Sequence, residues 1–169
     1  MKSNSAFGIP GFKILSELYQ STSCAVFRAE RVSDGKKAVL KTLNPAVAGD
    51  VSRARYFEEY SIAQRDELRS VVRAIDCISF EDTVAIVFED TGGVTLAELM
   101  NETSFNLSDC LEIGIHPSAT LREIHAHGIV HKDLNPFHLV MKEDGRELRL
   151  TDFGSASVLT KDHPNITDV

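Results

Sequence analysis

The predicted secondary structure changes at Gly92-Gly93 from mostly strands to mostly helices. This change constrains the fold more than any other feature of the sequence. The Asp-Gly turn of residues 33–36 joins two strand-like segments into a predicted hairpin. A segment without Gly or Pro, residues 52–68, is predicted to be a helix that begins at Ser52. Segments with the composition of β-strands precede the change: residues 12–18, 25–32, 37–43, 71–80 and 84–90.

Two helices are predicted after Gly92-Gly93, over residues 95–100 and 106–128. Pro117 lies inside the second one. A proline in mid-helix removes a hydrogen bond and costs about 3 kcal/mol, so we expect a kink or break there. Two short strands, residues 138–141 and 147–151, are predicted to follow.

The predicted fold is therefore α+β, with a sheet-rich lobe over residues 8–90 and a helix-rich lobe over residues 91–169. The segment near residues 90–95 is expected to be the hinge, and ligands favour clefts between lobes.

Composition narrows the class of function. The net charge of -7 argues against a nucleic-acid or anionic membrane surface, which needs clustered Lys and Arg. No apolar run approaches the roughly 18 residues of a membrane span, and the N-terminus lacks the apolar core of a signal peptide. Three scattered cysteines without a CxxC pair favour reduced thiols and a cytoplasmic protein, and the scattered histidines make a zinc site unlikely.

Four features of chemical interest occur in a fixed order along the chain. Each has an ordinary alternative, because Lys41 could be a surface lysine and a lone Asp-Phe-Gly could be a chance turn. On the predicted helix either Glu58 or Glu59 could face solvent, and we choose Glu59 because Phe57 and Ile62 would then lie on its inward side. The features are Lys41 in "AVLK", Glu59, Asp133 in "HKDLNPFH" and Asp152 in "DFG".

The chemistry of these side chains suits phosphoryl transfer. A lysine on a rigid strand can pair with triphosphate oxygens, and the carboxylate of Glu59 can hold that lysine in place. Asp133 can accept the proton of an attacking hydroxyl group. Asp152 supplies the oxygen ligands that Mg²⁺ prefers, and His131 is expected to brace the loop.

The ordered set resembles the signature of protein kinases. The stretches at residues 9–43, 88–99, 121–141 and 148–157 resemble the N-terminal serine/threonine kinase-like domain of bacterial hybrid sensor histidine kinases, and "IHAHGIVHKDLNP" within the third is the most telling part. The resemblance covers residues 8 to 160. It implies a bilobal kinase fold that binds ATP and Mg²⁺ between its lobes. A protein substrate or signalling partner is implied, together with downstream ATPase and histidine kinase modules.

The resemblance also assigns the residues that would contact adenine. The base would hydrogen-bond to the hinge near Glu89 to Thr91, and Phe88 would be the gatekeeper. Three valines would enclose the base: Val26, Val39 and Val140.

The chain departs from the kinase pattern in three ways. Tyr19, Ser21 and Cys24 stand where glycines of a phosphate loop would be, so side chains would hinder the approach of phosphate. His138 stands where a metal-binding Asn is expected, so the metal residues become Asp152 and His138, and imidazole suits softer metals than Mg²⁺. The chain ends fifteen residues after Gly154, so we expect a truncated helical lobe that could be completed by another chain.

We therefore expect a serine/threonine kinase-like domain with impaired turnover and better preserved ATP binding. Two alternatives stay open: a pseudokinase that acts as a regulatory or interaction module, and an inactive fragment.

Overall fold

The computed structural model describes residues 8–142, 145 and 147–159. The chain divides into two compact units. The first consists of Met1–Phe57 with Ala74–Asp90, and the second of Glu58–Arg73 with Thr91–Val169.

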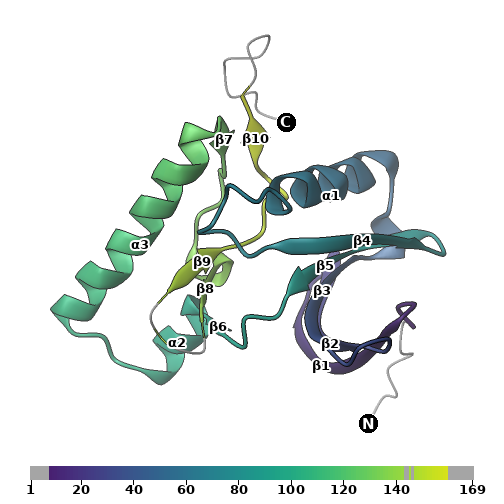
Figure 1. The fold of residues 1–169 in the computed structure, drawn as a ribbon, viewed down its shortest axis with the longest axis horizontal. Helices are drawn as coiled ribbons and strands as arrows, with labels where there is room; N and C mark the ends of the chain where they lie inside the picture. The colour runs from purple at the N-terminus through teal and green to yellow at the C-terminus, as the bar shows by residue number, and fades with distance from the viewer. Residues whose placement is uncertain (1–7, 143–144, 146, 160–169) are drawn as a thin grey trace. The chain divides into compact units, whose positions relative to one another are not determined.

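The first unit is built on a five-stranded antiparallel sheet in the order β1-β2-β3-β5-β4, and this sheet is strongly curved (Figure 1). The predicted hairpin is present, with Gly35 at φ 69° in the turn, a backbone angle that glycine adopts without strain. The strands are β1 (Phe12–Gln20), β2 (Cys24–Arg31), β3 (Lys37–Leu43), β4 (Ala74–Phe80) and β5 (Thr83–Glu89).

The two faces of this sheet differ in composition. Residues alternate between the faces along a strand, and directly paired residues share a face. One face carries a buried apolar cluster: Ile9, Ala29, Ala38, Leu40, Phe80, Ala85 and Val87. The register pairs Val26 with Lys41 and Val39 with Phe88, which places these four residues on the opposite face. The cluster therefore holds the unit together and leaves Lys41 and its apolar neighbours on the other side.

Helix α1 (Asp50–Ala63) is shorter and starts earlier than predicted. Ser52 is not its cap but lies in its first turn, where the hydroxyl donates to the carbonyl oxygen of Val47. Beyond Ala63 the chain forms turns instead of continuing the helix, because Leu68 is buried there and tertiary packing overrides helix propensity.

The start of β4 also differs from the prediction. The strand begins at Ala74 rather than at residue 71. Val71 instead forms a parallel bridge to Leu150, and the N–H of Val72 donates to the carbonyl oxygen of Leu150. These residues belong to the second unit, so pairing with another strand explains the shorter β4.

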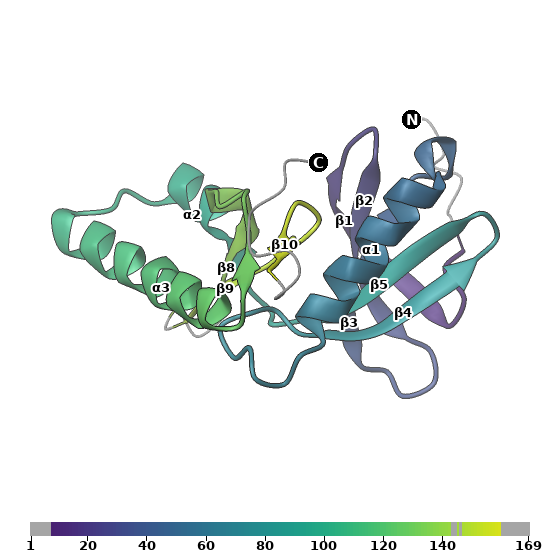
Figure 2. The same ribbon diagram turned by 90° about the horizontal axis from the view of Figure 1, so that it is seen from above.

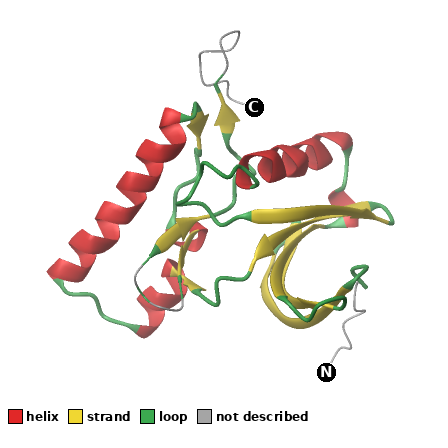
Figure 3. Cartoon of the chain, in the orientation of Figure 1, coloured by secondary structure: helices red, strands yellow, loops and turns green. Residues whose placement is uncertain are grey.

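The described part of the second unit contains the end of α1, the helices α2 and α3 and two small sheets, and α3 packs along β7 and β9 (Figures 1 and 2). The sheets are β6-β8-β9 and β7-β10. Figure 3 shows how short these strands are beside α3. The elements are β6 (Val94–Thr95), α2 (Leu96–Glu102), α3 (Leu107–Ala126), β7 (Ile129–Val130), β8 (Leu139–Met141), β9 (Leu148–Leu150) and β10 (Ser157–Val158), with 3-10 turns η1 (Pro45–Val47) in the first unit and η2 (Pro136–His138) in the second.

Helix α3 runs past Pro117 without interruption, so the predicted break is wrong. A capping box between Asn106 and Asp109 satisfies orphan N–H groups at its start, as the sequence predicts for Asn106. The proline costs one hydrogen bond, and the other turns of a twenty-residue helix retain theirs. No helix in the described part of the chain is long and apolar enough to cross a bilayer.

Candidate functional site

Lys41 lies in the middle of β3 on the face opposite the apolar cluster. Its side chain is largely buried, and its Nζ atom is 5.5 Å from the centroid of the Tyr56 ring, a cation–π distance. Val26 and Val39 are half-buried on the same face. The first unit therefore brings together one cation and two small apolar side chains that the sequence assigned to ATP.

The two neighbouring glutamates of α1 have opposite environments. Glu59 is only 1% exposed, whereas Glu58 is exposed. The prediction that Phe57 lies inward is wrong, because Phe57 is 48% exposed. The buried face of the helix includes Tyr56, Glu59 and Ile62, at the i, i+3 and i+6 spacing, and Ala63 is buried next to them. A buried carboxylate is costly without partners, so burial distinguishes Glu59 from Glu58. Its pairing with Lys41 stays a prediction.

The end of β5 and the residues just after it were predicted to be the hinge that contacts adenine. Phe88 is buried, and Glu89 and Thr91 are half-buried. Asp90 lies between the last two, and its Oδ2 atom is 3.0 Å from Nε of Arg28 on β2. This ion pair could not be predicted from the sequence, because only the register of the sheet brings the two residues together. Val140 lies half-buried on β8 in the second unit, and its role in adenine binding also stays a prediction.

The turn between β1 and β2 uses its own hydrogen-bonding groups. The Ser21 hydroxyl oxygen accepts from the N–H groups of Ser23 and Cys24, at 3.3 and 3.1 Å. The N–H of Ser21 donates to the carbonyl oxygen of Cys24. A phosphate loop needs N–H groups that point at its ligand. Here three of those groups are already engaged, which weakens this turn as a phosphate-binding loop.

His131 joins the loop that carries Asp133 to the segment that carries Asp152. It is 1% exposed, and its Nε2 lies 3.1 Å from the carbonyl oxygen of Thr151. Its Nδ1 accepts from the N–H of Asp133 at 3.3 Å, and its ring meets the Phe153 ring edge-on at 4.9 Å. These contacts fix the tautomer, with the proton on Nε2. The structure thus gives His131 the bracing position that the sequence predicts.

Two residues beside this histidine have left-handed backbone angles. Lys132 has φ 66° and Asp152 has φ 64°. Non-glycine residues in this region are strained, and such strain concentrates at functional sites. Asp152 is further held by the N–H of Gly154, which donates to Oδ1 at 3.3 Å. The backbone therefore sets the direction of the Asp152 carboxylate.

His138 lies between the two aspartates. Its Nδ1 is 3.6 Å from Oδ2 of Asp133, and its Nε2 is 3.6 Å from Oδ2 of Asp152. Asn135 orders this turn, because its side chain accepts from the N–H of Phe137 and its amide nitrogen is 3.2 Å from Oδ1 of Asp133. Asn135 was not among the predicted site residues, although an Asn directly before a proline is a known N-cap signal.

The carboxylate of Glu123 supports the strand that leads to Asp152. Glu123 on α3 accepts hydrogen bonds from the N–H groups of Arg69 and Ser70, at 3.0 and 2.9 Å. Burial alone raises the pKa of Glu123, but these bonds outweigh it and the pKa is lowered. The following residue, Val71, bridges to Leu150, so Glu123 supports β9 two residues before Asp152.

Stability is expected to fall on acidification because of His131. Burial lowers the pKa of His131 below its ordinary value of 6.5. The unfolded chain protonates this side chain at its ordinary pKa, so below pH 6.5 it binds more protons than the folded state. The unfolding free energy should therefore decline as the pH falls from about 6.5 toward the lower folded pKa. Urea denaturation between pH 8 and 5 measures this slope.

The control for this dependence of the unfolding free energy on pH is an exposed histidine. Replacing His131 with Gln should flatten the decline, whereas His125→Gln on the exposed surface of α3 should leave it unchanged. An equal slope in all three proteins would assign the pH dependence to other groups.

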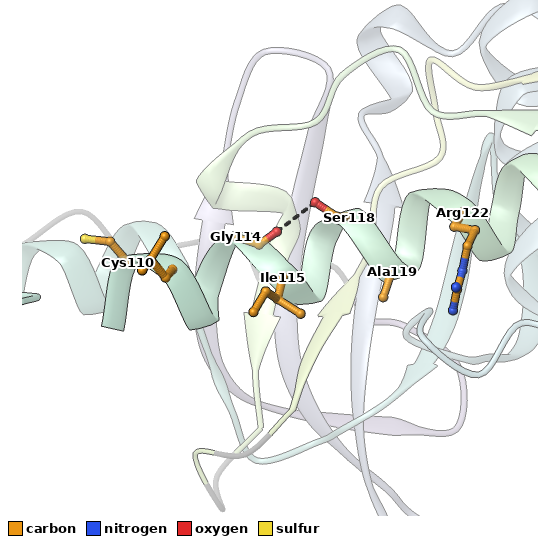
Figure 4. A pocket seen from close by; sticks show the side chains of 7 residues that line it. Cys110, Gly114, Ile115, Ser118, Ala119 and Arg122 are labelled. Atoms are coloured by element: carbon orange, nitrogen blue, oxygen red, sulfur yellow. Dashed lines mark hydrogen bonds between the residues drawn. The ribbon is translucent and has the colours of Figure 1, made fainter. Parts of the chain in front are cut away.

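A shallow hollow on α3 lies apart from these motif residues. Figure 4 shows Cys110, Gly114, Ile115, Ser118, Ala119 and Arg122 lining it, and Leu111 completes the set. The lining carries no predicted catalytic group, so the hollow does not contribute to the site. Cys77 is not a candidate nucleophile, because burial and the nearby Asp76 raise its pKa to about 11.

Comparison with known proteins gives the same family as the motifs. The family described as protein kinase domain matches residues 12–169. The chain is 27% identical over 89% of its length to both the probable serine/threonine-protein kinase PknB of Lactococcus lactis and the serine/threonine-protein kinase pkn2 of Myxococcus xanthus. It is 27% identical over 75% of its length to the smooth muscle myosin light chain kinase of Gallus gallus. The chain spans 24%, 19% and 8% of these three relatives.

Proposed function

Because the chain belongs to the protein kinase domain family, we propose that it binds ATP and transfers the γ-phosphate to a serine or threonine hydroxyl of a protein. The observation that carries this proposal is the placement of Asp133 and Asp152 on either side of one imidazole, at 3.6 Å each. Relatives that are serine/threonine kinases support the same reaction.

The proposed roles follow from the chemistry of each side chain. Asp133 is about half exposed and accepts the proton of the attacking hydroxyl group. Lys41 contacts the phosphates as a cation, and buried Glu59 holds Lys41 in place. Adenine is proposed to contact the following residues: Val26, Val39, Phe88, Glu89, Thr91 and Val140.

The residues present fit Mg²⁺ only in part. Asp152 supplies the carboxylate oxygens that Mg²⁺ prefers, and Asp152 would hold the ion that neutralises phosphate charge. His138 offers a ring nitrogen in place of an oxygen, and Mg²⁺ binds such ligands poorly. Turnover with Mg²⁺ is therefore proposed to be slow.

A second function, a pseudokinase in signal transduction, is favoured by one specific observation. Ser21 engages the N–H groups of the β1–β2 turn, which weakens phosphate binding at that turn. In this alternative the domain would bind a signalling partner without transferring phosphate.

We further propose that the chain works in the setting of a bacterial hybrid sensor histidine kinase, in the cytoplasm where ATP is available. The residues that support this are those of "IHAHGIVHKDLNP", 124–136. Sequencing the whole reading frame is the test, because ATPase and histidine kinase modules after this domain are expected. A reading frame without them would contradict the proposed setting and leave the kinase proposal intact.

The kinase and pseudokinase proposals are separated by ATP-dependent stabilisation and phosphate transfer. ATP at about 100 times its Kd should raise the unfolding free energy by about 2.7 kcal/mol. Replacing Glu59 with Gln should lower ATP affinity, because Lys41 loses its proposed partner, whereas Glu58→Gln should not, since Glu58 is exposed. Thermal melts of the three proteins and incorporation of labelled phosphate into a serine-rich protein such as casein measure both properties.

The outcomes distinguish the proposals. Stabilisation by ATP with phosphate incorporation supports the kinase, and stabilisation without incorporation supports the pseudokinase. Absence of any ATP effect on the melting of the unsubstituted chain would contradict the kinase proposal, and a broad or absent melting transition beside it would support the inactive fragment.

A further inference from the structure

The hydrogen bonds of His138 define which of its ring nitrogens carries a proton. Nδ1 is 2.8 Å from the backbone carbonyl oxygen of Asp133, an atom that can only accept. Nδ1 is therefore the donor, and its proton is taken up by this bond. The amide nitrogen of Asn135, 3.0 Å from Nδ1, also donates and has Oδ1 of Asp133 as an acceptor at 3.2 Å. In the neutral ring the other nitrogen, Nε2, consequently presents a lone pair.

This lone pair faces a carboxylate. Nε2 of His138 is 3.6 Å from Oδ2 of Asp152, and both side chains are partly exposed. Two acceptor atoms at this distance can bind one cation that lies between them. Ligand atoms on one ion at about 2.1 Å are about 3.0 Å apart in an octahedron and about 3.4 Å apart in a tetrahedron. A shift of a few tenths of an ångström would therefore let both atoms bind one ion.

The surroundings of His138 match those of metal-binding histidines in general. Such a histidine donates its other ring N–H to a carbonyl or carboxylate, which fixes the tautomer and directs the lone pair at the metal. Here the Asp133 carbonyl is that acceptor. The neutral imidazole is also a ligand that distinguishes between ions, because Mg²⁺ prefers oxygen whereas first-row transition metals bind nitrogen well.

We propose that Nε2 of His138 and Oδ2 of Asp152 together bind a divalent first-row transition metal, such as Mn²⁺, in preference to Mg²⁺. Among the described residues no group of three His, Cys, Asp or Glu could hold a metal. Water therefore fills the other positions, and phosphate oxygens replace some of that water if the proposed ATP-dependent function holds. Two protein ligands bind weakly alone, so the preference between ions is the diagnostic property rather than the affinity.

The experiment measures binding of Mn²⁺ to the whole chain without nucleotide, from the loss of the electron paramagnetic resonance signal of free Mn²⁺. Competition with Mg²⁺ gives the ratio of the two affinities. Mn²⁺ is expected to bind about tenfold more tightly than Mg²⁺ or better. His138→Asn should weaken Mn²⁺ binding about tenfold and bring the ratio close to one, and Asp152→Asn should weaken both ions.

The control variant is His125→Asn, which changes an exposed histidine of α3 and should leave the Mn²⁺ affinity unchanged. Co²⁺ gives an independent readout, because its visible absorption reports a nitrogen ligand and should lose that feature in His138→Asn. Circular dichroism checks that each variant is folded, and the Mn²⁺ to Mg²⁺ ratio of the unsubstituted chain tests the inference without any variant.

Equal affinities for Mn²⁺ and Mg²⁺ in the unsubstituted chain would overturn the inference, as would unchanged Mn²⁺ binding in folded His138→Asn. In the first case a protonated His138 would be the cation that links the two aspartates. Failure of the proposed function is a separate result, because it appears as a lack of ATP-dependent stabilisation while the preference for Mn²⁺ persists.

Discussion

Replacing Asp133 with Asn is expected to reduce phosphate transfer by about 10² to 10⁴-fold, the range that a general base contributes. Asn keeps the shape of the side chain and an oxygen that can accept from Asn135, which is 3.2 Å from Oδ1. It loses the basic carboxylate that would take the hydroxyl proton. ATP-dependent stabilisation should persist, because Asp133 is not among the residues proposed to bind the nucleotide. The rate of phosphate incorporation at saturating ATP measures the effect.

The matched control is Asp82→Asn, in the exposed turn between β4 and β5. It removes one negative charge from the chain without touching the loop of Asp133, so the rate should stay within about twofold of the unsubstituted value, as for most surface substitutions. Retention of full activity by Asp133→Asn would refute the assignment of the base. Equal losses in both variants would show that net charge, rather than the loop, controls the rate.

Much of the first unit could be predicted because local signals and burial agree there. The predicted strand "KAVLKTL" and the Asp-Gly turn before it are present as β3 and its hairpin. The choice of Glu59 over Glu58 also matches the burial, although one of the two reasons given for it was wrong, since Phe57 faces solvent. Helical spacing predicts a buried stripe better than it predicts which neighbour belongs to that stripe.

The misplaced boundaries have a common physical cause. Residues 64–68 have good helix propensity, but they form turns that bury Leu68. Val71 and Val72 have strand-like side chains, but they pair with Leu150 rather than extending β4. In both places a contact distant in sequence outweighs the local preference, and one sequence contains no direct signal for such contacts.

The sequence predicts which residues belong to the site around His138. It does not predict how the two aspartates are oriented there. The sequence places Asp133 and Asp152 in two motifs, but their orientation depends on left-handed backbone angles at Lys132 and at Asp152 itself. Those angles are stabilised by His131, which contacts both segments. A motif predicts which chemical groups are present, whereas tertiary contacts determine the orientation of those side chains.

Replacing Ile124 with Ala is expected to lower the unfolding free energy by about 2 to 5 kcal/mol, the cost of removing a large buried aliphatic side chain. Ile124 is fully buried on the half of α3 that ends at β7. A loss of this size is a large part of the total stability of a small domain, which is about 5 to 15 kcal/mol. Urea denaturation of both proteins at one pH measures the difference.

The same helix supplies the matched control. Ile115 has the same side chain but is 65% exposed, so Ile115→Ala should change the unfolding free energy by no more than about 0.5 kcal/mol. Alanine also has a higher helix propensity than isoleucine, which offsets part of any small loss. Equal and large losses in both variants would contradict the assigned burial, because Ile115 would then be covered in solution. Repeating the measurement at several protein concentrations would show whether a second copy of the chain covers it, since only that cause makes the loss depend on concentration.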